Sequence, residues 1–405
     1  MTSPVDTSVK FFSSTMVGAP VLSGTAGSLI AWLDAILKDG FDTKTLTSLV
    51  AAGGVMTATF TGTHSSLADT VVLIAGVTGG PTGFAGANGE QKVMARPSAT
   101  TTTWATTLPD GTYTGTITMK MAPLGWLKPF SGTNKAVYKS NDPASSGMYF
   151  RVDDSATTVA RVVGYESMTD VDTGLGPFPT TAQMSGGGYW GKSNVASATA
   201  VAWQLVGDSR IVYHAIQAGY SSSSANQIAA LRGFGDPIAL RPSGDPYSAF
   251  VHYSINSAAV SIDGCLGNNQ APQLASPRSY TGLGSSVLEY PQIWGLGGLN
   301  TQYSGVTDVH GAFPNRVDGA LYLSKKLTVE IGTTFPRSEL PGLYSVMQSN
   351  AWSTFKAGDK VPGAGLLTGR TLLTVHCVGS TSNMASAASA ATTGVVMVDV
   401  TGPWR

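Results

Sequence analysis

One segment near the start of the chain has the hydrophobic spacing of an amphipathic helix. Between residues 23 and 38, apolar side chains recur every three or four positions and so fall on one helical face. Ser23 or Thr25 is placed to cap its start, and Gly40 is placed to end it. The apolar stripe must be buried, either in the core of the chain or against a partner. It consists of Leu29, Ile30, Leu33, Ile36 and Leu37.

From residue 46 to residue 124 the spacing changes to short runs rich in Val, Thr and Ile, which is the pattern of β-strands. The run 111–121 is the clearest, because Tyr113, Ile117 and Met119 lie among threonines in the alternation of a half-buried strand. Gly, Pro, Asn and Asp divide the runs roughly every ten residues, a spacing typical of a β-sandwich. We therefore predict a small Ig-like β-sandwich domain over 46–124, with the glycine-rich stretch 78–90 as an exposed loop.

Residues 125–405 continue as candidate strands joined by long, irregular loops. Helical spacing is nearly absent there, although 224–235 has the composition of one short helical turn. Near the end, a small-residue stretch at 383–394 predicts a flexible loop before an edge strand, with Trp404 as a C-terminal anchor. The fold class is therefore mainly β, with an N-terminal arm and short helix (1–45), the small sandwich (46–124) and a larger irregular β-rich domain (125–405).

Charge is scarce and balanced along the whole chain. Charged residues make up 12% of the sequence, with 24 basic and 24 acidic side chains, against roughly 25% in an average soluble domain. A nucleic-acid binder carries a basic footprint and a membrane-surface protein a cationic face, so the composition argues against both classes. No apolar run reaches the length of about 18 residues that a spanning helix needs, so we expect no membrane insertion. The composition favours a protein that recognises other proteins in an assembly.

One motif resembles a catalytic sequence and lacks the partners that the chemistry needs. The stretch GDSR at 207–210 resembles the nucleophile block of GDS hydrolases, whose serine requires a DxxH pair to accept its proton. Downstream, Asp308 stands two positions before His310 instead of three. We therefore interpret GDSR as a turn after a strand.

The acidic residues do not form a convincing site either. Asp170 and Asp172 have the spacing of a calcium loop, but position twelve is Thr181 instead of a bidentate glutamate, which leaves at most a minor cation site. Asp153 and Asp154 are adjacent, so in a strand they face opposite ways, and we interpret both as turn acceptors.

The histidines, cysteines and aromatic residues add no motif of their own. Cys265 and Cys377 are far apart, which predicts two free thiols. The aromatic pairs Tyr189–Trp190 and Tyr290–Trp294 suit a core, a subunit interface or a glycan contact. The sequence thus predicts no enzyme, no catalytic residue, no cofactor and no metal, and it leaves the binding residues unassigned. The histidines occur without an HxH or HxxxH pair, at His64, His214, His252, His310 and His376.

Several long segments resemble virion structural proteins from the tail and baseplate region of tailed bacteriophages of Gram-negative bacteria. They span nearly the whole chain, at 1–50, 115–142, 149–179, 340–344, 358–375 and 398–405. The resemblance implies a homo-oligomeric subunit of the virion tail, assembled in the host cytoplasm, whose partners are other virion structural proteins. It also suggests that residues 1–20 form an arm that lies on a neighbouring subunit and becomes ordered on assembly.

Two other functions fit the same segments. One is a tail adhesin that binds a host receptor or surface glycan through the aromatic residues and loops of 125–405. The other is a capsid decoration protein, which differs only in its place on the particle. A fibre would show a repeat or a coiled-coil stalk, and the sequence has neither, which favours the tail or baseplate subunit.

Overall fold

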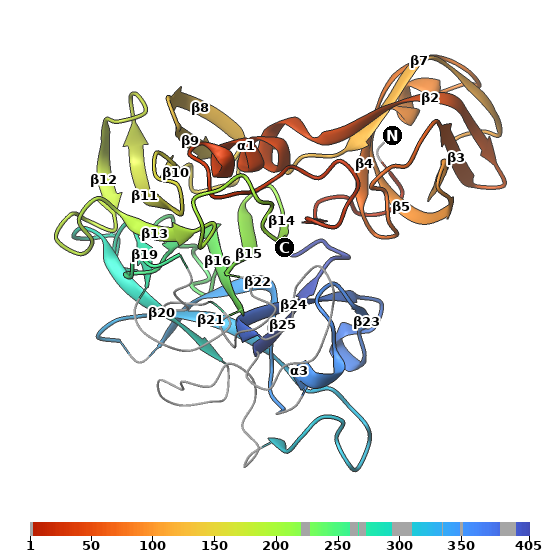
Figure 1. Ribbon diagram of the computed structural model, residues 1–405. Helices are drawn as coiled ribbons and strands as arrows, with labels where there is room; N and C mark the ends of the chain where they lie inside the picture. Colours follow the sequence, from red (N-terminus) through yellow and green to blue (C-terminus); the bar gives the residue numbers. More distant parts are fainter. Residues whose placement is uncertain are drawn as a thin grey trace.

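The computed structural model describes residues 3–219, 227–259, 266, 273–293, 310–333, 335–348, 351–380 and 394–405. The chain is built almost entirely of β-strands, which confirms the predicted mainly β class. Figure 1 shows three sheet units: a barrel at the upper right, a small sheet at the upper left, and a large sheet below them. Helix α1 (Ser28–Asp34) lies between the two upper units.

The first unit is a closed barrel with the strand order β2-β3-β6-β5-β4-β7. Side chains alternate along its strands, so that Tyr113, Ile117 and Met119 are buried while Thr114 is exposed, as the sequence predicts. A short 3-10 helix, η2 (Phe84–Ala87), lies in the largely exposed glycine-rich loop. The strands are β2 (Phe41–Ala52), β3 (Val55–Phe60), β4 (Val71–Gly79), β5 (Gly89–Ser98), β6 (Thr101–Ala105) and β7 (Gly111–Met121).

The prediction of a β-sandwich is therefore wrong for this unit, whose strands span 41–121. Two long strands close the sheet on itself. Strand β2 pairs with both β3 and β7, with register shifts around Leu46 and between Thr45 and Leu49, and β5 pairs first with β4 and then with β6. Such irregularities bend a strand and increase its twist, so each long strand turns a corner and joins what would otherwise be two separate sheets.

Helix α1 is shorter than predicted, and it continues as a π-helix, η1 (Ala35–Asp39), that ends at Gly40. All five residues of the predicted apolar stripe are buried. The predicted caps are wrong, because neither Ser23 nor Thr25 caps the helix and the N-cap position is Gly27. Gly40 ends the helix as predicted, with a φ of 74° that an L side chain rarely adopts.

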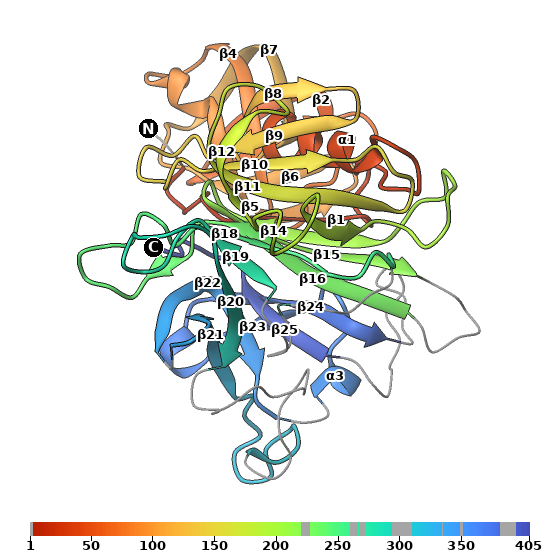
Figure 2. The same cartoon turned by 90° about the vertical axis from the view of Figure 1, so that its left-hand side faces the viewer.

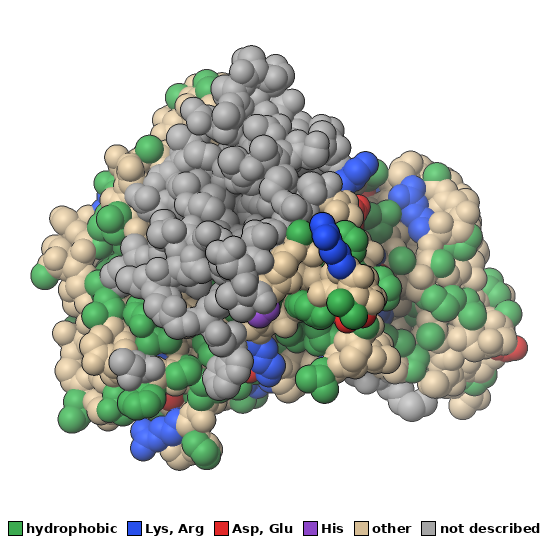
Figure 3. Space-filling view, turned by 90° about the horizontal axis from the view of Figure 1, so that it is seen from below, with side chains coloured by type: hydrophobic (Ala, Val, Ile, Leu, Met, Phe, Trp, Pro, Cys, Tyr) green, Lys and Arg blue, Asp and Glu red, His purple; other side chains and the backbone are tan. Residues whose placement is uncertain are grey.

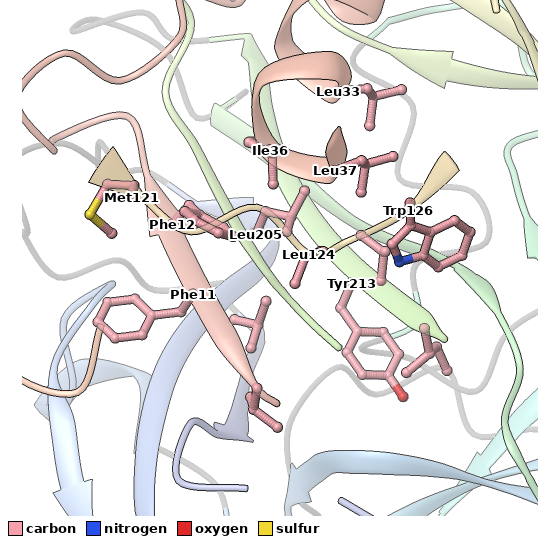
Figure 4. Close-up of a cluster of buried hydrophobic side chains, with 14 of the residues drawn as sticks. Phe11, Phe12, Leu33, Ile36, Leu37, Met121, Leu124, Trp126, Leu205 and Tyr213 are labelled. Atoms are coloured by element: carbon pink, nitrogen blue, oxygen red, sulfur yellow. The ribbon is translucent and has the colours of Figure 1, made fainter. Parts of the chain in front are cut away.

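The N-terminal segment is not an arm free to lie on a neighbour. Strand β1 (Lys10–Ser13) pairs with β14 (Trp203–Gly207) of the same chain. Figure 4 shows Phe12 of β1 beneath the helical residues Ile36 and Leu37, with Leu205 of β14 beside it. Val9, Phe11 and Phe12 are buried, and their burial supplies the apolar contact that the sequence analysis assigned to another subunit.

The second unit is a sheet in the order β12-β11-β10-β9-β8, with β13 paired to β11. Figure 2 shows it above the large sheet. Its strands are β8 (Leu127–Gly132), β9 (Lys135–Lys139), β10 (Tyr149–Asp153), β11 (Val159–Met168), β12 (Gly174–Phe178) and β13 (Gly188–Gly191).

The third unit is the large sheet, which begins with β1, β14 and β15 (Ile211–Gly219). From β16 onward it closes on itself, because the path β16-β18-β19-β20-β21-β22-β25-β24 returns to β16 through the pairing of β16 with β24. We call these eight strands the ring. Its strands are β16 (Gln227–Gly235), β18 (Phe250–His252), β19 (Leu274–Ser276), β20 (Val287–Ile293), β21 (Leu323–Glu330), β22 (Pro336–Val346), β24 (Thr371–Ser380) and β25 (Gly394–Asp399).

The remaining elements are short and attach to the ring. Strand β17 (Ile238–Ala239) pairs with β22 and β23 (Lys360–Pro362) pairs with β24, and α3 (Ala351–Thr354) and η3 (Gly365–Leu367) are helical turns. The predicted helical turn at 224–235 is wrong, because its described part is β16, whose residues extend the sheet formed by β15. Trp404 is an anchor as predicted: its indole donates a hydrogen bond of 2.9 Å to the carbonyl of Asp399 and packs against Tyr213.

Some predictions fall outside the described residues, namely Cys265, Trp294, most of the loop 383–394, and the side chain of Cys377. Figure 3, which views the molecule from below, shows few charged side chains among the described residues of that face. No helix in the described ranges is long and apolar enough to cross a membrane.

Candidate functional sites

The GDSR motif is a turn, as predicted. It connects β14 to β15, and the carboxylate of Asp208 accepts hydrogen bonds from the amides of Arg210 (2.7 Å) and Ile211 (2.8 Å). The Ser209 hydroxyl donates to the Asp142 carboxylate at 3.0 Å, and the Arg210 guanidinium pairs with the same carboxylate. These contacts assign the motif a role in shaping the connection between two strands.

The carboxylates of the calcium-like stretch already have partners. Asp170 accepts the amides of Asp172 and Thr173, which closes a turn. Asp172 forms ion pairs with Lys135 (2.9 Å) and Arg151 (2.6 Å). Within the described ranges, no three His, Cys, Asp or Glu side chains come together in a way that would hold a metal ion.

The adjacent aspartates Asp153 and Asp154 have different roles. Asp153 accepts hydrogen bonds from the amide and hydroxyl of Ser155, which confirms the predicted turn acceptor. Asp154 is fully buried, and its carboxylate accepts the helical amide of Leu29 at 2.8 Å, so the turn interpretation is wrong for this residue. Asp154 therefore caps helix α1, although 125 positions separate it from Leu29 in the sequence.

A buried lysine completes this cap. Lys192 pairs with the Asp154 carboxylate, and both side chains are fully buried. The ammonium also donates a hydrogen bond of 2.7 Å to the carbonyl of Thr25, just before the helix. Burial raises the pKa of the Asp154 carboxyl, and the hydrogen bond from Lys192 opposes that rise. The pair thus fixes the helix start and links it to the small sheet, a structural role.

Three of the histidines lie in the interior. His64, His214 and His252 are buried, His310 is partly buried, and the side chain of His376 is outside the described set. The ring of His214 packs edge-on against Trp190, with the centroids 4.7 Å apart. Burial lowers the pKa of His214 to about 3 and that of His64 to about 4. These imidazoles are therefore neutral core residues near neutral pH.

The aromatic pairs divide between core and surface. Trp190 is buried and donates a hydrogen bond of 2.7 Å from its indole to the carbonyl of His252. Tyr189 is half-buried beneath the guanidinium of Arg161, which lies 3.8 Å from the ring centroid. Tyr290 is half-buried on β20. Neither Trp190 nor Tyr189 is thus free to contact a ligand.

Sequence analysis missed a buried charged cluster in the ring. Glu289 on β20 and Glu330 on β21 stand directly opposite each other, an arrangement in which like charges repel. Arg337 of β22 lies between them, with its guanidinium 2.6 Å from Glu289 and 3.6 Å from Glu330. It also pairs with Asp245 at 2.8 Å. We call Arg337, Asp245, Glu289 and Glu330 the Arg337 cluster.

Arg337 is the cation that the three carboxylates of the cluster share. Burial lowers the pKa of Arg337, but the nearby carboxylates of Glu289 and Asp245 outweigh burial and the pKa is raised overall. The hydroxyl of Ser276 adds a 2.7 Å hydrogen bond to Glu289. The only hint in the sequence was a glutamate within each of two apolar strands, because the partners come from separate parts of the chain.

A pocket of about 750 Å³ opens above the Arg337 cluster, and we call it the hairpin pocket because it adjoins the hairpin formed by β21 and β22. Its walls include Leu240, Tyr280 and Phe335, of which Tyr280 is 50% and Phe335 76% exposed. Glu330 and Arg337 lie at its base, with side chains no more than 10% exposed.

A second hollow, of about 920 Å³, lies between β22, β23 and the segment 313–323, and we call it the lower groove. Phe313, Tyr344 and Phe355 contribute apolar side chains to a lining that is both polar and apolar. Leu366 at its border is fully exposed, and Val317 in the adjacent segment is 95% exposed. Two ion pairs flank the apolar lining, Lys325 with Glu339 and Arg370 with Asp399.

Comparison of the chain with models of known protein families finds no match. Comparison with curated protein sequences finds none either.

Proposed function

We propose that the chain is a non-enzymatic structural subunit of a bacteriophage tail or baseplate, which works by packing against copies of itself and other virion proteins. The observation that carries the proposal is the lower groove, whose lining combines apolar side chains with ion pairs and includes the fully exposed Leu366. Large exposed apolar side chains gathered around a concave surface mark an interaction site in soluble proteins.

The anatomy of the lower groove supports a protein partner. Stable protein interfaces combine an apolar centre with a polar rim, and the ion pairs Lys325–Glu339 and Arg370–Asp399 supply such a rim. Leu366 lies within η3, whose backbone hydrogen bonds fix the main chain at this position, so the backbone loses little freedom when a partner binds. The resemblance of long segments to tail and baseplate proteins adds support, as does the scarcity of charge.

Incorporation into particles tests the role of the lower groove. We expect Leu366→Asp to reduce incorporation at least tenfold, because a buried unpaired carboxylate at an interface costs several kcal/mol. Leu175→Asp is the matched control, since Leu175 is a 74% exposed leucine on the small sheet. Particles grown with each variant are purified and the chain is quantified by immunoblot. If Leu366→Asp is incorporated as well as the wild-type chain, the lower groove is not an assembly contact.

The position on the particle is tested by electron microscopy with a gold-labelled antibody against the barrel, residues 41–121. We expect the label at the tail or its tip. Label over the head would support a capsid decoration protein instead of a tail subunit. Unlabelled particles would refute a virion role altogether.

A further inference from the structure

We infer that the hairpin pocket binds a neutral saccharide of one to three sugar units. This inference does not depend on the proposed function, because it concerns a different surface from the lower groove. It rests on a pocket with exposed aromatic walls, a base made of fixed hydrogen-bonding groups, and a mixed charge that disfavours ionic ligands.

The walls present apolar faces that have no internal packing role. Most large aromatic side chains in this chain are buried, whereas Tyr280 and Phe335 are 50% and 76% exposed and line the same pocket. Leu240, which is 42% exposed, extends the apolar wall. Aromatic rings bury large areas with few rotatable bonds, and a pyranose ring has apolar C–H faces that can lie against them.

The base of the pocket supplies rigid polar groups. The Glu330 carboxylate accepts the amide of Tyr280 at 3.0 Å, which ties this acceptor to the aromatic wall. Arg337 is held by Asp245 and Glu289, so neither the base nor its charges need to rearrange when a ligand enters. Groups fixed in advance lose little entropy on binding. Arg241 at the rim is exposed and donates a long hydrogen bond, of 3.4 Å, to the carbonyl of Tyr280.

The mixed charge disfavours ligands that carry a single sign of charge. Arg241 and Arg337 oppose the entry of a cation, and Glu330 and Asp245 oppose the entry of an anion. Hydroxyl groups both donate and accept, so they are the ligand groups that can satisfy a guanidinium and a carboxylate together. A volume of about 750 Å³ is in the range of small-molecule sites and admits a short saccharide.

The test uses the purified full chain and an array of immobilised neutral mono- to trisaccharides of glucose, galactose, mannose and N-acetylglucosamine. Any saccharide that binds is then titrated by calorimetry. We expect Tyr280→Ala and Phe335→Ala each to weaken binding about tenfold, the effect of removing one stacked ring. Leu175→Ala is the matched control, because it removes a 74% exposed apolar side chain on the small sheet, outside the pocket, and should leave the affinity unchanged.

Both aromatic side chains are exposed, so the variants are expected to fold, which circular dichroism and the unfolding midpoint will verify. Arg241→Ala provides a second, polar test and should also weaken binding. The inference is overturned if no neutral saccharide binds the wild-type chain, or if binding survives both aromatic substitutions unchanged. It is equally overturned if charged saccharides or peptides compete more strongly than the neutral saccharides.

Discussion

The barrel and the ring are both closed by hydrogen bonds, but their buried residues differ in kind. Most buried side chains of the barrel are apolar, such as Met56, Trp104 and Met119, although Lys92 of β5 is also buried and donates a hydrogen bond to the carbonyl of Val400. The ring buries the Arg337 cluster, and Lys326 and His252 are also fully inaccessible there. A barrel held by apolar contacts gains from every side chain separately, whereas an ion cluster is stable only as a complete set. Single substitutions should therefore destabilise the barrel and the ring in different ways.

The largest effect is expected from Arg337→Met. Removing the guanidinium leaves three carboxylates buried without their cation, which should lower the free energy of unfolding by about 3–5 kcal/mol. Hydrogen exchange measured by mass spectrometry should show faster exchange in β21 and β22 than in the barrel. Arg241→Met is the control, and an equal loss there would contradict the cluster as the cause.

Almost as large an effect is expected at helix α1, which lies between the barrel and the small sheet. Asp154→Ala removes the cap of α1 and leaves Lys192 buried without its partner, so we expect a loss of about 3–4 kcal/mol in urea denaturation. Asp153→Ala, one residue away, removes a turn contact and a partly exposed ion pair with Arg151, and should cost under about 1 kcal/mol. Similar losses in the two variants would refute the special role of Asp154.

In the barrel, Met119→Ala should cost about 2–3 kcal/mol, the effect of a cavity in a core that can partly collapse. This loss should not vary between pH 7 and pH 5, because no charge is left unpaired. Thr114→Ala on the outer face of the same strand is the control. A loss that depends on pH would show that the barrel also relies on charge.

The smallest expected effect concerns His214. Its pKa in the folded chain is about 3, below the ordinary value of 6.5, so the unfolded chain binds more protons between these values and stability falls as pH decreases. The contribution is about 1.4 kcal/mol per pH unit, or about 2 kcal/mol at pH 5. His214→Phe should remove the contribution of one proton from the slope of the unfolding free energy against pH. An unchanged slope would mean that His214 is protonated in the fold.

Local patterns predicted the elements that depend on neighbouring residues. The apolar stripe of α1, its end at Gly40, the alternation along β7 and the GDSR turn all follow from spacing within a short window. The closure of the barrel did not follow, because it depends on bulges that let β2 pair on both sides. Alternation alone is the same in a sandwich and in a barrel.

The candidate sites were harder to predict for a related reason. Asp245 and Glu289 come from segments distant from the hairpin that carries Glu330 and Arg337, and each of the four alone resembles an ordinary surface residue. Asp154 was misassigned because its cap partner is more than a hundred positions earlier. Strand β1 seemed to lack a core because its partner strand begins near residue 203. In each case the deciding contact is one that local sequence does not encode.

The cap that Asp154 provides also determines when the first part of the chain can become stable during synthesis. Helix α1 leaves the ribosome long before Asp154, Lys192 and the strand β14 that pairs with β1. Contacts between such distant positions form slowly, because a long loop must close first. The nascent N-terminal region therefore exposes its apolar stripe until about half of the protein has been made. A chaperone that holds this stripe, or slow translation before residue 203, would be expected to change the yield of folded protein more than its final stability.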